Sequence, residues 1–341
     1  MPATTKPKGL AKIWREITRP FRQMCGSHVE VKSNKTARLS AWDSPLNIEP
    51  EGLKKLYDQL VANTDELSRE VAARFIARRL FYAESGDGSI WDVLSKVLRF
   101  MYPLDYADQE RINALGGTCD SPYKFPKGST SPAHMAIHYG LNQFPSEIQQ
   151  NFAGKDIIDG GGFLGDSAVV FTEYNPKKVY VFEPNPDTLP AMKHVLEENS
   201  VALGTRKNLI EIVPLALGRS KGTLTLHSNG ETDGTATTLP YACTTNVHEV
   251  DVISIDEFVE AQALNVGLIK LDVEGAEYDT ILGAKGTILK QKPPLIISIY
   301  HTFKDFFEIK PLIESWGVGY KFEIRHHNPL ASDSEFVLMA Y

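Results

Sequence analysis

The chain has 341 residues, 42% of them hydrophobic and 23% charged, with a net charge of −7, the proportions of a soluble globular protein. Residues 1–38 hold nine Lys or Arg against two Glu, so the remainder carries a net charge of −14 and is not expected to bind nucleic acid. No run of about 18 apolar residues and no secretory segment occurs, so we expect neither a membrane span nor export.

The N-terminal 40 residues are basic and are predicted to form a mobile tail. An anionic-membrane contact or an organelle presequence is the alternative for this segment. The three cysteines, Cys25, Cys119 and Cys243, are too scattered for a disulfide framework or a zinc site. This cysteine usage favours a reducing, cytoplasmic location.

Residues 41–145 are predicted to form a helical accessory region and linker. Apolar residues recur at helical spacing between residues 50 and 101, and the stretch that follows is rich in Pro, Gly and Ser, which marks a boundary. We expect this region to serve packing or oligomerisation, so a homo-oligomer is one of the expected states of the protein. His134 and His138 lie four residues apart, but no third metal ligand is evident, so a surface or interface role is favoured.

Residues 146–341 alternate strands and helices, which predicts a mainly parallel sheet covered by helices on both faces. The first strand begins at Asp156 and leads into a glycine turn. Glycines let the backbone approach a ligand closely, and a polar residue suits the first turn of the helix that follows. The candidate cofactor-binding residues of this turn are Asp159, Gly160, Gly161, Gly162, Gly165, Asp166 and Ser167.

Two acidic residues narrow the kind of nucleotide expected at this turn. Residues 160–165 fit the G-x-G-x-x-G pattern of nicotinamide and flavin enzymes. Asp159 would repel a pyrophosphate but suits the ammonium and sulfonium of S-adenosylmethionine, which has no phosphate. Glu183 ends the second predicted strand 18 residues after Gly165, near the spacing of a carboxylate that binds ribose hydroxyls. We therefore predict S-adenosylmethionine as the cofactor.

The middle of this region supplies further predicted elements. A helix is expected over residues 186–198, with Asn185 as its cap and Pro186 as its first residue. The polar stretch 228–248 has the length of a functional loop and is expected to line the acceptor pocket. Ser254-x-x-Glu257 is a capping box. Further strands are predicted over residues 210–217, 223–227, 250–254, 293–301, 320–327 and 335–341.

A carboxylate cluster ends the strand that begins at Leu268. Asp272, Glu274 and Glu277 lie within six residues, and such acids are costly unless they face water, cations or hydrogen-bond donors. Ligands of these sheets bind beyond the carboxyl ends of the strands. Asp272 and Glu274 are therefore candidates to grip the cofactor, orient an acceptor hydroxyl or hold a divalent cation, with helix capping as the alternative. His301 ends the next strand and is either a proton acceptor or a packed histidine.

Five motifs occur in a fixed order over the second half of the chain: Asp159-Gly-Gly-Gly-Phe-Leu-Gly-Asp166, Phe182-Glu-Pro184, Ile269-Lys-Leu-Asp-Val-Glu-Gly-Ala-Glu277, Ser298-Ile-Tyr-His301 and Tyr320-Lys-Phe-Glu-Ile-Arg-His326. Together they resemble the FkbM family of S-adenosylmethionine-dependent methyltransferases, from about residue 148 to the C-terminus. The resemblance implies a Rossmann-like class I methyltransferase sheet with a C-terminal antiparallel hairpin strand.

The resemblance also implies methyl transfer to a hydroxyl of a sugar, glycan or natural product. Carried onto this sequence, it implies that residues 159–162 and Glu183 bind the methyl donor. Asp272 would serve both the donor and the reacting centre, together with Glu274 and His301. Residues 1–145 fall outside the resemblance, so it does not identify the small-molecule or glycan acceptor.

The expected reaction is an in-line displacement at the methyl carbon, in which alignment supplies roughly 7–11 kcal/mol. His301, Asp272 or Glu274 would remove the hydroxyl proton, or a divalent metal at Asp272 would lower the hydroxyl pKa; the sequence does not define the ligands of such a metal. The alternatives are a nicotinamide-dependent oxidoreductase and a catalytically inactive binding module with the same fold. Asp159 and the carboxylate cluster argue against the first, and the intact set of acids argues against the second.

Overall fold

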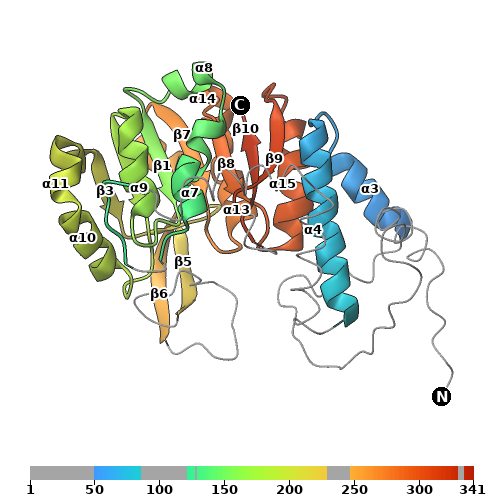
Figure 1. Ribbon diagram of the computed structural model, residues 1–341, viewed down its shortest axis with the longest axis horizontal. Helices are drawn as coiled ribbons and strands as arrows, with labels where there is room; N and C mark the ends of the chain where they lie inside the picture. The colour runs from blue at the N-terminus through green and yellow to red at the C-terminus, as the bar shows by residue number, and fades with distance from the viewer. Residues whose placement is uncertain (1–49, 86–120, 127–128, 229–245, 329–333) are drawn as a thin grey trace.

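The computed structural model describes residues 50–85, 121–126, 129–228, 246–328 and 334–341. A seven-stranded sheet runs through the molecule in the order β3-β2-β1-β7-β8-β10-β9 (Figure 1). The first five of these strands are parallel, and β10 lies antiparallel between β8 and β9. Their bounds are β1 Asp156–Gly160, β2 Lys178–Phe182, β3 Ile210–Val213, β7 Val266–Leu271, β8 Leu295–Ser298, β9 Phe322–His326 and β10 Phe336–Ala340.

This strand order confirms the predicted Rossmann-like sheet with its antiparallel hairpin strand near the C-terminus. Both faces of the sheet are covered, because neighbouring residues of one strand enter different clusters. Ile157 packs in a cluster with Phe171, whereas Ile158 packs in the cluster that holds Ile288. A strand buried on both faces has no polar side to present, which explains the run of apolar residues.

Helices follow most of the parallel strands and form the two outer layers. The longer ones are α9 Asp166–Phe171, α10 Leu189–Glu198, α12 Ile255–Gln262, α13 Glu277–Leu282, α14 Lys285–Gln291 and α15 Phe303–Ser315. Shorter segments are α7 Pro132–Ala136, η2 His138–Gln143, α8 Ser146–Gln150, η3 Thr172–Tyr174, α11 Ser200–Leu203 and η4 Gly204–Leu209. The predicted capping box at the start of α12 is confirmed, since the side chains of Ser254 and Glu257 bond each other's backbone N–H.

A second sheet of three strands extends from the main one, with β5 and β6 reaching away from it in Figure 1. It holds β4 Ala216–Leu217, β5 Gly222–Ser228 and β6 Asn246–Ile253. The single strand predicted over residues 210–217 is therefore wrong. Pro214 separates β3 from β4, because proline has no N–H to continue the ladder. The chain then leaves the main sheet, and Ala216–Leu217 pair with β6.

The predicted start of the helix after β2 is also wrong. The helix α10 begins at Leu189 instead of Pro186. The Asn185 side chain accepts a hydrogen bond from Asp187 N at 3.1 Å and donates one to Thr188 Oγ1 at 2.8 Å. These bonds close a turn in front of the helix, which is the conformation that short polar side chains offer as an alternative to helix.

Two N-terminal helices, α3 Pro50–Leu60 and α4 Glu66–Ser85, lie beside β9 and α15 (Figure 1). Arg325 Nη2 pairs with Asp65 Oδ2 at 2.6 Å, and Lys310 Nζ donates to Ala62 O at 2.6 Å. These helices confirm the helical pattern before residue 86. The predicted tail over residues 1–40, the amphipathic stretch 89–100 and most of the loop 228–248 lie outside the described residues. In the described part of the chain, no helix is long and apolar enough to cross a membrane.

Candidate active site

The carboxyl ends of β1, β2, β7 and β8 open into one cavity of about 420 Å³. This is the position where open parallel sheets bind their ligands. The predicted site residues in its lining are Gly161, Asp166, Ser167, Glu183, Asp272 and Glu274. The other predicted site residues, Asp159, Gly160, Gly162, Gly165 and His301, do not line this cavity.

The glycine turn after β1 requires glycine for two separate reasons. Gly161 has φ +77°, and a Cβ there would lie 1.7 Å from the carbonyl oxygen of Asp272. Its N–H and that of Gly162 both donate to Phe182 O at 3.0 Å. Gly165 has φ +78° and is the N-cap residue that immediately precedes α9. The turn is thus pressed against the end of β7, and a side chain would push the two strand ends apart.

Asp159 stabilises this turn from below instead of facing the cavity. Its side chain is fully buried, accepts a hydrogen bond from Ser167 Oγ at 2.6 Å and pairs with Lys270 Nζ at 3.1 Å. Lys270 also donates to the carbonyl of Gly161 at 2.8 Å. The negative charge of Asp159 is therefore balanced inside the protein. The direct contact between Asp159 and a cationic donor stays a prediction. The structure adds a second role, in which Asp159 holds the glycine turn through Ser167 and Lys270.

Lys270 is a site residue that the sequence reasoning did not assign. It lines the cavity and lies inside an otherwise apolar buried strand. Burial lowers the pKa of Lys270, but the nearby carboxylates of Asp159 and Asp272 raise it by a larger amount. The pKa of Lys270 therefore lies above its usual value, and the ammonium stays charged. A charged residue in a buried strand was the signal available in the sequence, because such a charge needs a partner.

Glu183 lies at the tip of β2 and is held by two backbone groups. Its Oε2 accepts from Phe163 N at 2.8 Å and its Oε1 from Asn185 N at 2.9 Å. The residue is only 8% exposed, and this burial raises the pKa of Glu183 to about 7 despite the two hydrogen bonds. The carboxylate lines the cavity with a fixed orientation, which suits a role in binding ligand hydroxyls.

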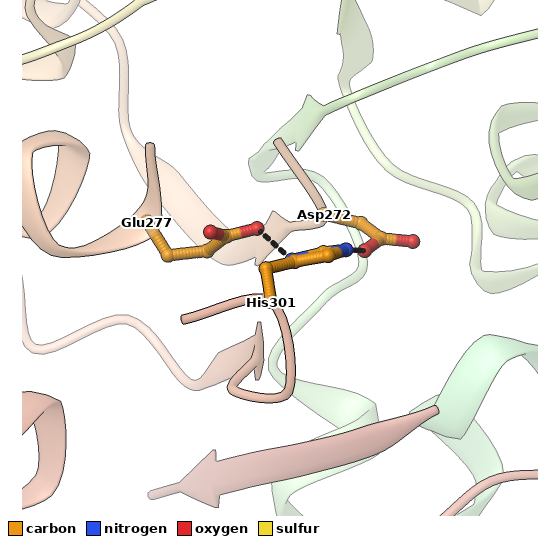
Figure 2. A group of neighbouring side chains, drawn as sticks. All are labelled: Asp272, Glu277 and His301. Carbon is orange, nitrogen blue, oxygen red and sulfur yellow. Dashed lines mark hydrogen bonds and ion pairs between the residues drawn. The ribbon is translucent and has the colours of Figure 1, made fainter. Parts of the chain in front are cut away.

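The ends of β7 and β8 bring an imidazole between carboxylates. His301 Nδ1 lies 2.9 Å from Glu277 Oε1, and Nε2 lies 3.7 Å from Asp272 Oδ1 and 3.5 Å from Glu274 Oε2. Figure 2 shows the ring between Glu277 on one side and Asp272 on the other. Tyr300 Oη also donates to Asp272 at 3.4 Å. Residues up to 29 positions apart in the sequence thus form one cluster.

Electrostatics makes this cluster strongly coupled. Burial alone would lower the pKa of His301, but Glu277 and Glu274 raise it well above its usual value. Burial raises the pKa of Asp272, yet Lys270 and His301 outweigh this effect and hold it below its usual value. Without a bound ligand the imidazole is therefore a cation at neutral pH and Asp272 an anion, which argues against His301 as a free base in that state.

The family of the chain follows from a match to a known sequence model. A family model described as "Methyltransferase FkbM domain" matches residues 153–322. This range runs from just before β1 to the first residue of β9 and contains the glycine turn, Glu183 and the carboxylate cluster. The chain therefore belongs, through residues 153–322, to the FkbM methyltransferase family. This confirms the family resemblance predicted from the five motifs. No curated protein sequence matches the chain.

Solved structures with some similarity include methyltransferase FkbM from Methylobacillus flagellatus KT, at 18% identity and TM-score 0.44, covering 62% of this chain and 59% of that one. Precorrin-6y C5,15-methyltransferase from Geobacter metallireducens GS-15 has 11% identity and a TM-score of 0.40, and the match covers 66% of this chain and 96% of that one. A Streptococcus mutans protein in complex with SAH has 13% identity and a TM-score of 0.32, and the match covers 58% of this chain and 97% of that one. The chain spans 59% of the length of the first structure.

The FkbM chain closes the other side of the cavity with residues from outside the matched domain. His134 lines the cavity, and its Nε2 pairs with Glu335 Oε2 at 3.0 Å. Tyr139 donates from its hydroxyl to Asp166 Oδ2 at 2.5 Å. His138 instead lies 2.9 Å from the hydroxyl of Tyr174. His134 thus lines the cavity instead of lying on the open surface, the interface role predicted for the pair stays a prediction, and the two histidines do not converge on one site.

His327 is a second cavity histidine that the sequence reasoning missed. It is 4% exposed, and its Nε2 has no hydrogen-bond partner among the described residues. Burial, together with the charges of His134 and Arg325, lowers the pKa of His327 to about 3, so the ring is neutral. A Cβ at Gly140 would lie 2.5 Å from its Cε1, which explains the glycine there. Nothing local in the sequence indicates that residues 140 and 327 meet.

Proposed function

We propose that this FkbM protein transfers the methyl group of S-adenosylmethionine to a hydroxyl of a sugar, glycan or natural-product acceptor. The observation that carries the proposal is the single cavity that joins Glu183 and the glycine turn to Asp272 and Glu274. The first group of residues suits a nucleoside, and the second suits the reacting centre. The cavity continues to polar groups beyond them, where an acceptor has room to bind.

The distribution of charge supports a cationic methyl donor. Asp159 is paired with Lys270, and the carboxylates that line the cavity are those of Asp166, Glu183, Asp272, Glu274 and Glu335. Among them, Asp272 and Glu274 lie together just after the end of β7. A sulfonium and an ammonium beside these two groups would reduce the cost of burying them. The electrostatic argument for S-adenosylmethionine therefore rests on these two residues, and Asp159 contributes through the shape of the turn.

Donor binding in this proposal extends from β2 to β7. The ribose hydroxyls would donate to the fixed carboxylate of Glu183, because its oxygens keep further lone pairs after bonding two N–H groups. The backbone of Gly161 would lie against the donor, since no side chain separates it from the cavity. The methionine end would then reach Asp272, which places the sulfonium at the ends of β7 and β8.

The proposed reaction needs alignment more than covalent help from the protein. The acceptor oxygen attacks the methyl carbon, the carbon–sulfur bond breaks, and neutral S-adenosylhomocysteine leaves while the hydroxyl proton is removed. Orientation of the two reactants can supply roughly 7–11 kcal/mol of the barrier reduction. The predicted proton acceptors are Asp272, Glu274 and His301, and the contacts of His301 with three carboxylates favour a carboxylate for this role.

The acceptor side of the cavity favours a ligand rich in hydroxyls. Ser298, Tyr300, His134 and Glu335 all line it, and such side chains donate and accept hydrogen bonds with a polyol. The helices α3 and α4 contact β9 and α15 and contribute no lining residue among those described. We therefore propose that residues 50–85 serve packing or assembly, in line with the predicted accessory role.

The test has two arms. Calorimetry with S-adenosylhomocysteine and with NAD should show saturable binding of the first alone. Incubation with radiolabelled S-adenosylmethionine and a library of glycans and hydroxylated metabolites should label at least one product. Binding of NAD without S-adenosylhomocysteine would overturn the proposal in favour of an oxidoreductase. Donor binding with no labelled product in any pool would favour the inactive binding module.

A further inference from the structure

The cluster at the ends of β7 and β8 contains a set of atoms arranged like metal ligands. One ligand atom each from Asp272, Glu277 and His301 lies within 4.8 Å of the other two. Asp272 lines the cavity, whereas Glu277 is fully buried and His301 nearly so. The cluster is therefore reachable from the cavity on one side and enclosed by protein on the other.

The buried side of the cluster fixes the orientation of the imidazole. Glu277 Oε1 lies 2.9 Å from His301 Nδ1 and also accepts from Val273 N at 2.8 Å, while Oε2 accepts from Gly275 N at 2.9 Å. A carboxylate held by backbone N–H groups only accepts hydrogen bonds, so Nδ1 carries the proton. A carboxylate behind the ring is the usual outer partner of a metal-binding histidine, because it sets the tautomer.

The other ring nitrogen is buried without a hydrogen bond. His301 Nε2 has no hydrogen-bond partner among the described residues, and the side chain is 10% exposed. It lies 3.7 Å from Asp272 Oδ1 and 3.5 Å from Glu274 Oε2, which is too long for a good hydrogen bond. With metal–ligand bonds of about 2.1 Å, two ligands of one ion lie about 3.0–4.2 Å apart. Both separations fall in this range.

We propose that Asp272 and His301 Nε2 bind a divalent first-row metal ion, with Glu274 as the third ligand and Glu277 as the positioning residue of the histidine. One nitrogen and two carboxylate oxygens suit Mn²⁺ or Zn²⁺ better than Ca²⁺, which prefers oxygen ligands alone. A divalent ion would also balance part of the negative charge of the three carboxylates gathered around one imidazole.

The role of this ion rests on the proposed methyl transfer. An ion at the ends of β7 and β8 would coordinate the acceptor hydroxyl and lower its pKa. The hydroxyl proton would then pass to water in the open cavity, and the oxygen would attack the methyl carbon as the carbon–sulfur bond breaks. The protein would need no neutral basic side chain in this arrangement, and His301 would act as a ligand.

The experiment uses the full chain, treated with EDTA, desalted and titrated with MnCl₂ alone while free Mn²⁺ is followed by electron paramagnetic resonance. We expect one saturable site per chain. His301→Ala and Asp272→Asn should each weaken the binding at least tenfold, and Glu277→Gln should weaken it about 10–100-fold. His194→Ala, which removes a histidine that is 73% exposed, should leave it unchanged. Circular dichroism establishes that each variant is folded.

Absence of saturable Mn²⁺ binding to the unaltered chain would overturn the metal site. Equal binding by His301→Ala and the unaltered chain would overturn it as well. Calorimetry with S-adenosylhomocysteine in EDTA separates the two proposals. If the donor analogue binds and the metal does not, the metal site fails while the methyltransferase proposal stands.

Discussion

The two sides of the cavity differ in how their polar groups are satisfied. On the donor side, Asp159 is bonded to Ser167 and Lys270, and Glu183 is bonded to two backbone N–H groups. On the acceptor side, Nε2 of His301 and Nε2 of His327 are each buried with no hydrogen-bond partner among the described residues, whereas Nδ1 of His301 is bonded to Glu277.

This difference indicates which side is complete before ligands arrive. Buried polar groups are almost always hydrogen-bonded, and one left unpaired costs about 1–3 kcal/mol. The donor side has formed its contacts within the protein, so its shape is set by folding. The acceptor side keeps two ring nitrogens without a hydrogen bond among the described residues, and an ion or a substrate would occupy them. Variants on the two sides should therefore fail differently, through stability on the first and through activity on the second.

The largest expected effect is on activity, from Asp272→Asn. If Asp272 removes the proton or holds the ion, methyl transfer to an acceptor identified by the library screen should fall about 10²–10⁴-fold, with little change in melting temperature. Asp279→Asn alters an exposed carboxylate of α13 and should retain activity. Equal rates in the two variants would remove Asp272 from the reacting centre.

Gly161→Ala should cause the largest loss of stability, because the new methyl group would meet Asp272 O at 1.7 Å. The free energy of unfolding, measured in urea, should fall by more than 4 kcal/mol, and binding of S-adenosylhomocysteine should be lost. Gly154→Ala is the matched control, since it also has positive φ (+71°) but open space around it. It should cost only about 1–2 kcal/mol. Similar costs in both variants would contradict the close packing of the turn against β7.

Lys270→Met leaves Asp159 as a buried charge without its partner, which typically costs about 3–5 kcal/mol. Lys177→Met is the control, because it breaks a pair with another buried aspartate, Asp156, from a lysine that is 60% exposed. That change should cost about 1 kcal/mol or less. The double variant Asp159→Asn/Lys270→Met should recover part of the loss. Additive losses would show that the two side chains do not stabilise each other.

The smallest effect concerns pH. The pKa of Glu183 is raised from 4.5 to about 7 by burial, so its contribution to stability is full below pH 4.5 and is lost as pH rises through 7. Between these limits the unfolding free energy should fall by about 3 kcal/mol, and Glu183→Gln should reduce this slope. Burial also raises the pKa of Asp305 to about 7, but Asp305 does not line the cavity.

Comparing the two acids separates stability from ligand binding. Asp305→Asn should reduce the slope of stability with pH in the same direction as Glu183→Gln. Only Glu183→Gln should also change how the affinity for S-adenosylhomocysteine depends on pH, measured by calorimetry between pH 5 and 8. The same change in both variants would remove Glu183 from the donor site.

Local patterns in the sequence determined the parallel sheet, the glycine turn after its first strand, and the acidic residues at the tips of three strands. These features depend on neighbouring residues alone: apolar runs form strands, glycine permits positive φ, and the carboxyl ends of parallel strands meet at one edge. The same patterns gave the wrong start for the helix after β2, because Asn185 can either cap a helix or form a side-chain turn. It forms the turn, and the helix begins at Leu189.

Tertiary structure alone decided the partners of these residues. Asp159 meets Lys270, 111 positions away, and His134 and His327 enter the same cavity from opposite ends of the folded region. No local signal encodes such pairs, because they arise only when the sheet brings distant segments together. The charge of each buried group, and hence its chemistry, depends on those distant partners.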